Sequence, residues 1–220
     1  MGTRGSERDA ATRAALVAAE ARLFAALGLD VRERRLDLAG GPVSYARVLE
    51  SGEGPVLVLL HGAGGGGALW APLLAQLRDH HAIAIDLPGC GLSAPFDFSG
   101  VDLRAHAVSF LTALLDALDL SRVALVCNSL GATYALYLAT EGDDRLSHLL
   151  LLGATGVALP GGRTTRLMAL MSRRWVARTT GALMPRMSPS MSRRFFASIV
   201  GRPAVDAVVD EMFGSSRTSN

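Results

Sequence analysis

The chain has 220 residues, which allows one α/β domain with a small appendage but not two full-sized domains. Half of the residues are apolar and 19% are charged, which is the composition of a packed domain. The formal net charge of +2 gives no reason to expect a nucleic-acid partner. All 22 basic residues are Arg, and the absence of Lys excludes a Walker A phosphate loop, a pyridoxal Schiff base and the Tyr/Lys pair of short-chain dehydrogenases.

The cysteines and the N-terminal sequence indicate the compartment. Cys90 and Cys127 are the two cysteines, and no CxxC or His/Cys spacing suits a metal, so we expect neither a disulfide framework nor a metal site. Arg and Glu interrupt the first thirty residues, and no run approaches the roughly 18 apolar residues of a membrane span. The sequence therefore predicts a cytoplasmic protein with no integral membrane segment.

The predicted elements begin with an amphipathic helix over 7–27 that stops at Gly28, followed by an antiparallel hairpin over 31–38 and 43–49. Short apolar runs then alternate with helical patterns. The runs are 55–60, 82–86, 123–127 and 148–152, and the helical patterns are 69–78, 102–118 and 130–140. This alternation predicts an α/β fold with a mostly parallel sheet, covered by helices on both faces and preceded by the hairpin.

The composition changes after the last apolar run. Residues 160–220 contain ten Arg against three acidic residues, with Met, Phe and Trp interleaved, and they predict short helices without another strand. We therefore divide the chain into an N-terminal helix (1–30), an α/β core (31–158) and a basic helical segment (159–220). Solvated helix faces explain the Arg residues, and peripheral binding to an anionic membrane is an alternative.

A glycine-rich stretch offers a first hypothesis about function. Gly62, Gly64 and Gly67 form a GxGxxG pattern after a predicted strand, and Asp86 ends the next strand nineteen residues after Gly67. This spacing matches a dinucleotide-binding fingerprint, and a dinucleotide-binding oxidoreductase is thus one alternative. Against it, His61 stands directly before the first glycine, and a hairpin precedes what should be the first strand of that fold.

Three motifs, each at the carboxyl end of a predicted parallel strand, favour another interpretation. They are HGAGG at 61–65, DLPGCGLS at 86–93 and CNSLGA at 127–132. In this order they resemble the α/β-hydrolase family, and the resemblance spans about residues 42–158. The resemblance implies an α/β-hydrolase sheet, a small-molecule substrate and no cofactor.

The resemblance also implies roles for individual residues. Ser129 would be the nucleophile on a sharp strand-to-helix turn, and the backbone N–H groups of Ala63 and Leu130 would form the oxyanion hole. Cys127 stands where the family usually has glycine. The alternative for Ser129 is an ordinary helix N-cap. The residues that would support the site are His61, which resembles a structural histidine, Asp86, which would order the loops, and Gly62, Gly64, Asn128 and Gly131.

A serine hydrolase of this family takes its acid and its histidine from later strands. His148 is the last histidine, and it begins its predicted strand, so it would lie at the opposite sheet edge from Ser129. Likewise, His80 and His81 precede their strand, and His106 fits a packed helix position. We therefore expect this chain to lack the acid, the histidine and the C-terminal strands, with 159–220 resembling part of a helical cap.

Two consequences follow for function. An intact member would hydrolyse an ester or a related acyl or C–C bond, and Asn128 with the HGxG loop is similar to hydrolases of aromatic ring-fission products. We expect catalysis by Ser129 to be impaired in this chain, and a degenerate, non-catalytic protein that binds a ligand or a partner is the alternative. An unpaired apolar sheet edge also predicts self-association.

Overall fold

The structure is a computed structural model that describes the backbone of residues 3–154 and the side chains from residue 10 of that range onward. The helical segment expected at 159–220, with its basic residues, lies outside the described residues. So does any strand after residue 154. The described residues therefore include the N-terminal helix, the sheet and the three motifs.

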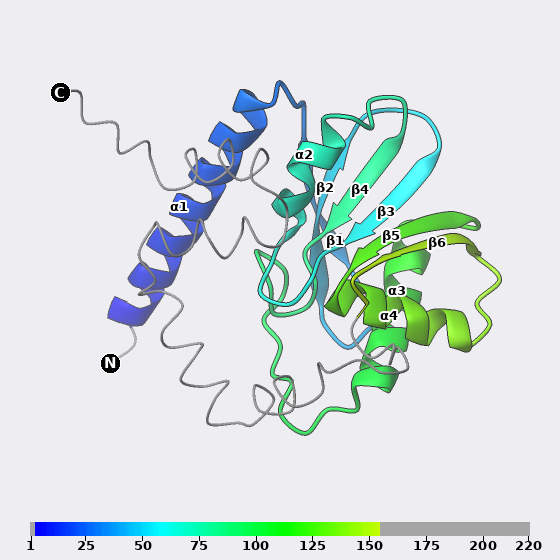
Figure 1. Cartoon of the computed structure of the whole chain (residues 1–220). Helices are drawn as coiled ribbons and strands as arrows, with labels where there is room; N and C mark the ends of the chain where they lie inside the picture. Colours follow the sequence, from blue (N-terminus) through cyan, green and yellow to red (C-terminus); the bar gives the residue numbers. More distant parts are fainter. Residues whose placement is uncertain (1–2, 155–220) are drawn as a thin grey trace, which may run out of the picture. The chain divides into compact units, whose positions relative to one another are not determined.

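The described part contains a six-stranded sheet with the strand order β1-β2-β4-β3-β5-β6 (Figure 1). Strands β3 to β6 run parallel to their neighbours among themselves, whereas β2 pairs antiparallel with both β1 and β4. This confirms the mostly parallel α/β sheet with an N-terminal hairpin. The strands are β1 (Arg32–Asp37), β2 (Tyr45–Ser51), β3 (Val56–Leu60), β4 (His81–Ile85), β5 (Val123–Asn128) and β6 (Leu146–Leu152).

The helices follow local signals in the sequence. Helix α1 (Thr3–Ala26) is followed by Gly28 at a φ of 60°, the left-handed conformation that glycine adopts readily. The Asp102 carboxylate caps α3 (Leu103–Ala117) by accepting hydrogen bonds from the backbone N–H groups of Arg104 and Ala105. Helix α4 (Leu130–Thr140) begins two residues after β5 ends.

The helix predicted over 69–78 is wrong in length. A 3₁₀ turn (Gly67–Trp70) leads into α2 (Ala71–Leu74), which makes a single α-helical turn. The N–H groups of Gln76 and Leu77 then bond to carbonyls three residues back, so the chain tightens and leaves the helix. The apolar spacing at 69–78 reflects packing on the sheet and not a long helix.

Apolar residues pack against both faces of the sheet. On one face, Phe110 of α3 and Tyr134 of α4 are fully buried with inward-facing strand residues such as Val58 and Leu125. On the other face, a smaller cluster joins residues of β2, β3, β4 and β5 to α2, and Phe24 of α1 packs against it. Strands β3 and β4 are buried on both faces, which explains their continuous aliphatic runs.

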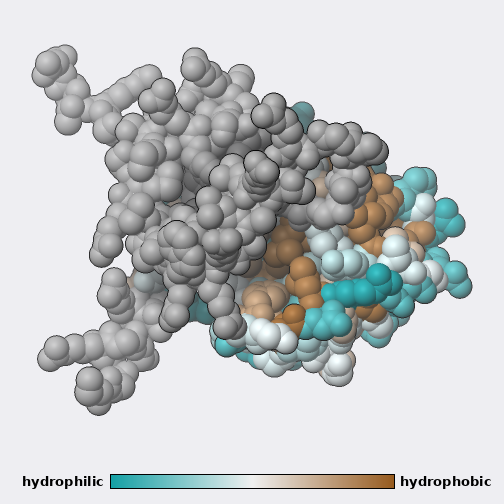
Figure 2. Space-filling view, turned by 60° about the horizontal axis from the view of Figure 1, so that its bottom comes forward, coloured by the Kyte–Doolittle hydropathy of each residue, from teal (hydrophilic) through white to brown (hydrophobic). Residues whose placement is uncertain are grey.

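The two outer strands of the described sheet differ in character. Arg32 and Arg34 of β1 both pair with Glu50 of β2, and such a charged edge opposes pairing with another chain. In contrast, β6 contains no charged residue, and its Leu150 and Leu152 side chains are 54% and 40% exposed. Apolar side chains also gather on the visible face of the described residues in Figure 2. Self-association through β6 stays a prediction.

No helix in the described range is both long and apolar enough to cross a membrane.

Helix α4 approaches the sheet closely at Gly131. A Cβ atom there would lie 2.6 Å from the Leu60 carbonyl oxygen and 2.8 Å from that of His61. The Gly131 N–H donates a hydrogen bond to the His61 carbonyl at 3.1 Å, so α4 is held at this distance. Glycine at this position therefore lets the first turn of α4 pack on the end of β3.

We expect Gly131→Ala to lower the free energy of unfolding by about 3 kcal/mol, because the new methyl group meets backbone oxygens that cannot rotate away. Urea denaturation followed by circular dichroism measures this change. Gly142→Ala is the control, since Gly142 has a positive φ of 77° but open space around it, and we expect it to cost about 1 kcal/mol. Equal effects of the two substitutions would contradict the close approach of α4.

Candidate active site

Ser129 forms the sharp turn between β5 and α4. Its φ of 50° and ψ of −109° depart from the extended backbone of an ordinary N-cap. Asp119 is the other non-glycine residue with a positive φ in the described range. The Ser129 side chain makes no capping hydrogen bond to α4, which speaks against the N-cap alternative. The turn thus leaves the hydroxyl free of the helix.

Hydrogen bonds from two neighbouring segments hold this turn. The Ser129 N–H donates to the Leu152 carbonyl at 2.9 Å, and the Asn128 side-chain amide donates to the same oxygen at 3.1 Å. On the other side, the Gly131 N–H bonds to the His61 carbonyl. The turn is therefore fixed between the end of β6 and the segment that follows β3. The Asn128 side chain supplies one of the hydrogen bonds to the end of β6.

The glycine loop after β3 lies directly beside Ser129. A Cβ atom at Gly62 would lie 3.1 Å from the Ser129 Cβ, 3.6 Å from its Oγ and 2.8 Å from the Asn128 Oδ1. Gly64 has a φ of 72°, and the Gly65 N–H closes a turn onto the Gly62 carbonyl at 3.2 Å. The fold thus brings the first and third sequence motifs together, and a larger residue at Gly62 would displace the serine.

Two backbone N–H groups near the serine have no hydrogen-bond partner among the described residues. They belong to Leu130, directly after Ser129, and to Ala63, directly after Gly62. Unpaired N–H groups are the donors that an oxyanion requires. The resemblance to the family implied these two N–H groups as the oxyanion donors, and this role stays a prediction.

His61 connects the glycine loop to the segment after β4. Its side chain is buried, and Nε2 accepts a hydrogen bond from the Leu87 N–H at 3.0 Å. The ring proton is therefore on Nδ1, which lies 2.6 Å from the Gly62 carbonyl and donates to it. Burial lowers the pKa of His61 and keeps the ring neutral. Both ring nitrogens are thus occupied by backbone groups.

Asp86 is also buried, and its carboxylate connects two loops. Oδ1 accepts a hydrogen bond from the Gly67 N–H at 2.5 Å, and Oδ2 accepts one from the Leu92 N–H at 2.8 Å. The Arg47 guanidinium lies 3.4 Å from Oδ2. Asp86 is therefore not available to bind a ribose, and the short helix after the glycine loop offers little to a pyrophosphate. Both observations argue against the dinucleotide interpretation.

Arg47 is a buried residue beside the candidate site that the sequence did not indicate. It is 3% exposed on β2 and surrounded by acidic groups, and sequence reasoning missed it because one Arg in a strand gives no signal of burial.

Cys127 is completely buried at the end of β5, and burial raises the pKa of its thiol to about 12. The sulfur is therefore a neutral, small apolar group in place of the usual glycine.

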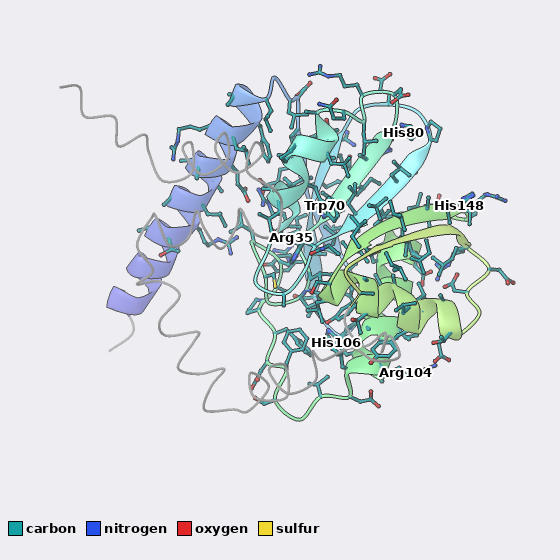
Figure 3. The ribbon with its side chains drawn as sticks, viewed as in Figure 1. Arg35, Trp70, His80, Arg104, His106 and His148 are labelled. Atoms are coloured by element: carbon teal, nitrogen blue, oxygen red, sulfur yellow. The ribbon has the colours of Figure 1, made fainter. Side chains whose placement is uncertain are left out.

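The histidines near the starts of strands lie at the amino edge of the sheet, where Figure 3 labels His80 and His148. His148 pairs with Ala124 in the sheet register, five residues before Ser129, which corresponds to roughly 17 Å along the strand. His81 begins β4 and pairs with Val56 at the same amino edge, and His80 precedes it. The expectation that these side chains cannot act on Ser129 is therefore supported by the register.

His106 is a packed core histidine, as the sequence indicated. It is 5% exposed, and its ring lies 4.2 Å from the Phe96 ring and 5.8 Å from the Tyr134 ring, centroid to centroid. Neither ring nitrogen has a hydrogen-bond partner in the described part of the chain, and burial lowers the pKa of His106. All five histidines of the sequence fall within this part, and no hydrogen bond there joins one of them to Ser129.

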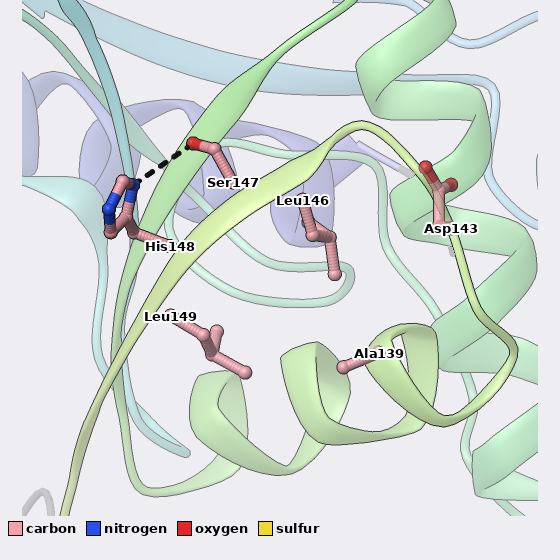
Figure 4. Close-up of a pocket in the computed structure, with 6 residues that line it drawn as sticks. All are labelled: Ala139, Asp143, Leu146, Ser147, His148 and Leu149. Atoms are coloured by element: carbon pink, nitrogen blue, oxygen red, sulfur yellow. Dashed lines mark hydrogen bonds between the residues drawn. The ribbon is translucent and has the colours of Figure 1, made fainter.

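A shallow groove of about 240 Å³ lies at the amino edge of the sheet, between the end of α4 and the start of β6 (Figure 4). His148 and Ser147 face one another there at 3.3 Å, and Asp143 is paired with Arg145. The groove lies at the opposite edge from Ser129, so it does not contribute to the candidate site. Within residues 3–154 no cluster of His, Cys, Asp or Glu could hold a metal ion.

A parallel sheet whose strand turns into a helix through a strained serine, beside a glycine loop, is the architecture of a serine-hydrolase fold. The model of the alpha/beta hydrolase family matches residues 57–218, and the chain belongs to this family. The family assignment agrees with the three motifs at 61–65, 86–93 and 127–132.

Individual curated relatives match about half of the chain. The chain is 39% identical over 118 residues to a 2-succinyl-6-hydroxy-2,4-cyclohexadiene-1-carboxylate synthase of Pectobacterium atrosepticum, which is 51% of this chain and 44% of that protein. It is 34% identical over 136 residues to a 2-hydroxy-6-oxo-2,4-heptadienoate hydrolase of Pseudomonas putida, 56% of this chain and 45% of that protein. The chain thus spans about half the length of the curated relatives that it matches.

Among solved structures, naproxen esterase (carboxylesterase NP) of Bacillus subtilis superposes with a TM-score of 0.59 at 21% identity. The superposition covers 71% of this chain and 54% of the esterase. At this identity the match supports the fold alone.

We expect the stability of the chain to fall as the pH drops below about 6.5, because the unfolded state binds protons that folded His61 and His106 take up less readily. The variant His106→Phe should reduce the slope of the free energy of unfolding against pH. It should also raise the free energy of unfolding at pH 7 by about 1 kcal/mol, since Phe removes two buried unpaired nitrogens. Urea denaturation at pH 5.5 and 7 measures both effects. An unchanged slope in the variant would show that His106 is not buried in a neutral form.

Proposed function

We propose that the chain supplies the nucleophile and the oxyanion donors of a serine hydrolase that acts on a small carbonyl substrate. The observation that carries this proposal is the Ser129 turn, with its positive φ, its uncapped side chain and Gly62 directly beside it. A hydroxyl raised above the sheet in this way is accessible to a substrate, whereas one that caps a helix is not.

The reaction would begin with the attack of the Ser129 Oγ on the carbonyl carbon of the substrate. A new C–O bond forms, the carbonyl π electrons move to the oxygen, and the Oγ proton passes to a base. The N–H groups of Ala63 and Leu130 would stabilise the resulting oxyanion, because they have no partner within the described residues. The base then returns this proton to the leaving group, which departs as the C–O or C–C bond breaks, and water hydrolyses the resulting acyl-enzyme.

The base is the element that the described residues do not provide. Of the five histidines, His61 is occupied at both nitrogens, His106 lies among aromatic rings, and the other three lie at the amino edge. A serine without a base keeps its proton, so we expect slow acylation supported by binding and by the oxyanion donors.

One relative suggests the substrate class. It is a hydrolase of 2-hydroxy-6-oxo-2,4-heptadienoate, and we therefore propose a C–C bond adjacent to a carbonyl group, or an ester, as the bond that is cleaved. A second candidate is a degenerate protein that binds a ligand in the same place without turnover. Such a protein would need only the Ser129 turn and the glycine loop beside it, and the described residues contain both.

Covalent labelling with a fluorophosphonate probe tests the nucleophile. We expect slow labelling of the wild-type chain, none of Ser129→Ala, and wild-type labelling of the control Ser121→Ala, an exposed serine before β5. Hydrolysis of a p-nitrophenyl ester should fall at least about 10-fold in Ser129→Ala. Labelling that persists in Ser129→Ala would remove Ser129 as the nucleophile. No labelling of the wild type, with ligand binding retained, would favour the binding protein.

A further inference from the structure

A buried cluster of charged side chains joins four segments that are distant in the sequence. Arg47 of β2 donates to Glu20 of α1 at 2.6 Å and to Glu33 of β1 at 2.8 Å, and it lies 3.4 Å from Asp86 after β4. The side chains of Arg47, Glu20 and Asp86 are 4%, 9% and 0% exposed, respectively. Charges are buried to this extent when they are paired, and the Arg47 guanidinium is the common partner of all three carboxylates.

The members of this cluster differ in what their removal would do. Without Arg47, the buried Asp86 would lack its counter-charge, which strongly destabilises a fold. Without Glu20, Arg47 still faces Glu33 and Asp86, so the guanidinium stays paired but loses the partner that fixes it from the side of α1. Burial raises the pKa of Glu20, and the hydrogen bond and the charge of Arg47 act in the opposite direction.

The cluster extends to both loops of the candidate site. Asp86 holds Gly67, the last residue of the glycine loop that contains Ala63, and Leu92 of the second motif. In addition, the backbone N–H of Arg47 donates a hydrogen bond to the Ser93 Oγ at 2.8 Å. The Ser93 hydroxyl in turn donates to the backbone carbonyl of Asp86 at 2.5 Å. A shift of the Arg47 side chain would therefore be transmitted to both loops through Asp86.

Helix α1 contacts the rest of the described structure through its last two turns. Glu20, Leu23 and Phe24 share one face at helical spacing, with Glu20 and Leu23 buried and Phe24 packed on the smaller apolar cluster. Side chains 10–18 are nearly all exposed. The apolar contacts attach α1, and Glu20 is the member of this face that touches the charged cluster.

We propose that helix α1 positions the active-site loops, with Glu20 fixing Arg47 and Arg47 fixing the Asp86 carboxylate that holds Gly67 and Leu92. Glu20 and Arg47 are positioning residues, because neither touches Ser129. The consequence for catalysis rests on the proposed function of Ser129, whereas the order of the loops does not depend on it.

Hydrogen–deuterium exchange of the full chain tests the proposal. In Glu20→Ala we expect the amides of residues 62–67 and 87–93 to exchange about 10-fold faster than in the wild type, because the charge-assisted bonds to Arg47 are lost. The variant Glu20→Gln keeps one acceptor and should show a smaller increase. Amides of β5 should be unchanged. The control Arg22→Gln alters an exposed charge on the same helix and should leave both loops at the wild-type rate.

Amide exchange in both loops at the wild-type rate in the Glu20→Ala variant would overturn the proposal. Equally accelerated exchange of the β5 amides would also overturn it, because it would indicate general destabilisation of the fold. If Glu20→Ala does not fold, Glu20→Gln decides by the same comparison. The rate of fluorophosphonate labelling adds a second readout, and we expect Glu20→Ala to react about 10-fold more slowly. An unlabelled wild-type chain would contradict the function of Ser129, and the exchange data would still decide the role of α1.

Discussion

The left-handed backbone of Ser129 is the constraint on which the rest of the candidate site depends. A non-glycine residue in such a conformation costs on the order of 1–3 kcal/mol, and it persists when its surroundings leave no alternative. Here the absence of side chains at Gly62 and Gly131 lets the loop after β3 and the first turn of α4 close in on the serine. The Leu152 carbonyl completes the enclosure by accepting the serine N–H.

A second layer of polar groups holds this enclosure in place. His61 and Asp86 are almost completely buried, and each connects the glycine loop to the segment after β4 through backbone N–H or C=O groups. Arg47 links Asp86 to the outer strand and to α1. The catalytic proposal and the proposal for α1 are therefore two parts of one network, in which buried charges position backbone groups.

The sequence predicted the features that depend on local patterns. Aliphatic runs identified the parallel strands, and the resemblance of CNSLGA to the α/β-hydrolase motif implied the turn at Ser129, because these signals lie within a few neighbouring residues. The contact between Glu20 and Arg47 could not be predicted, since 27 residues separate them and a charged residue on a helix usually faces solvent. The helix predicted over 69–78 failed for a related reason, because tertiary packing produced the apolar spacing and the hydrogen bonding did not follow it.

A crystal structure of the chain would test the central claim most directly, through the backbone of residue 129. We expect a φ near 50°, a hydrogen bond from its N–H to the Leu152 carbonyl, and its hydroxyl beside Gly62 without a capping bond to α4. A Ser129 with helical or extended φ whose hydroxyl caps α4 would contradict the account, because the strained turn and the access of the hydroxyl to a substrate would both be lost.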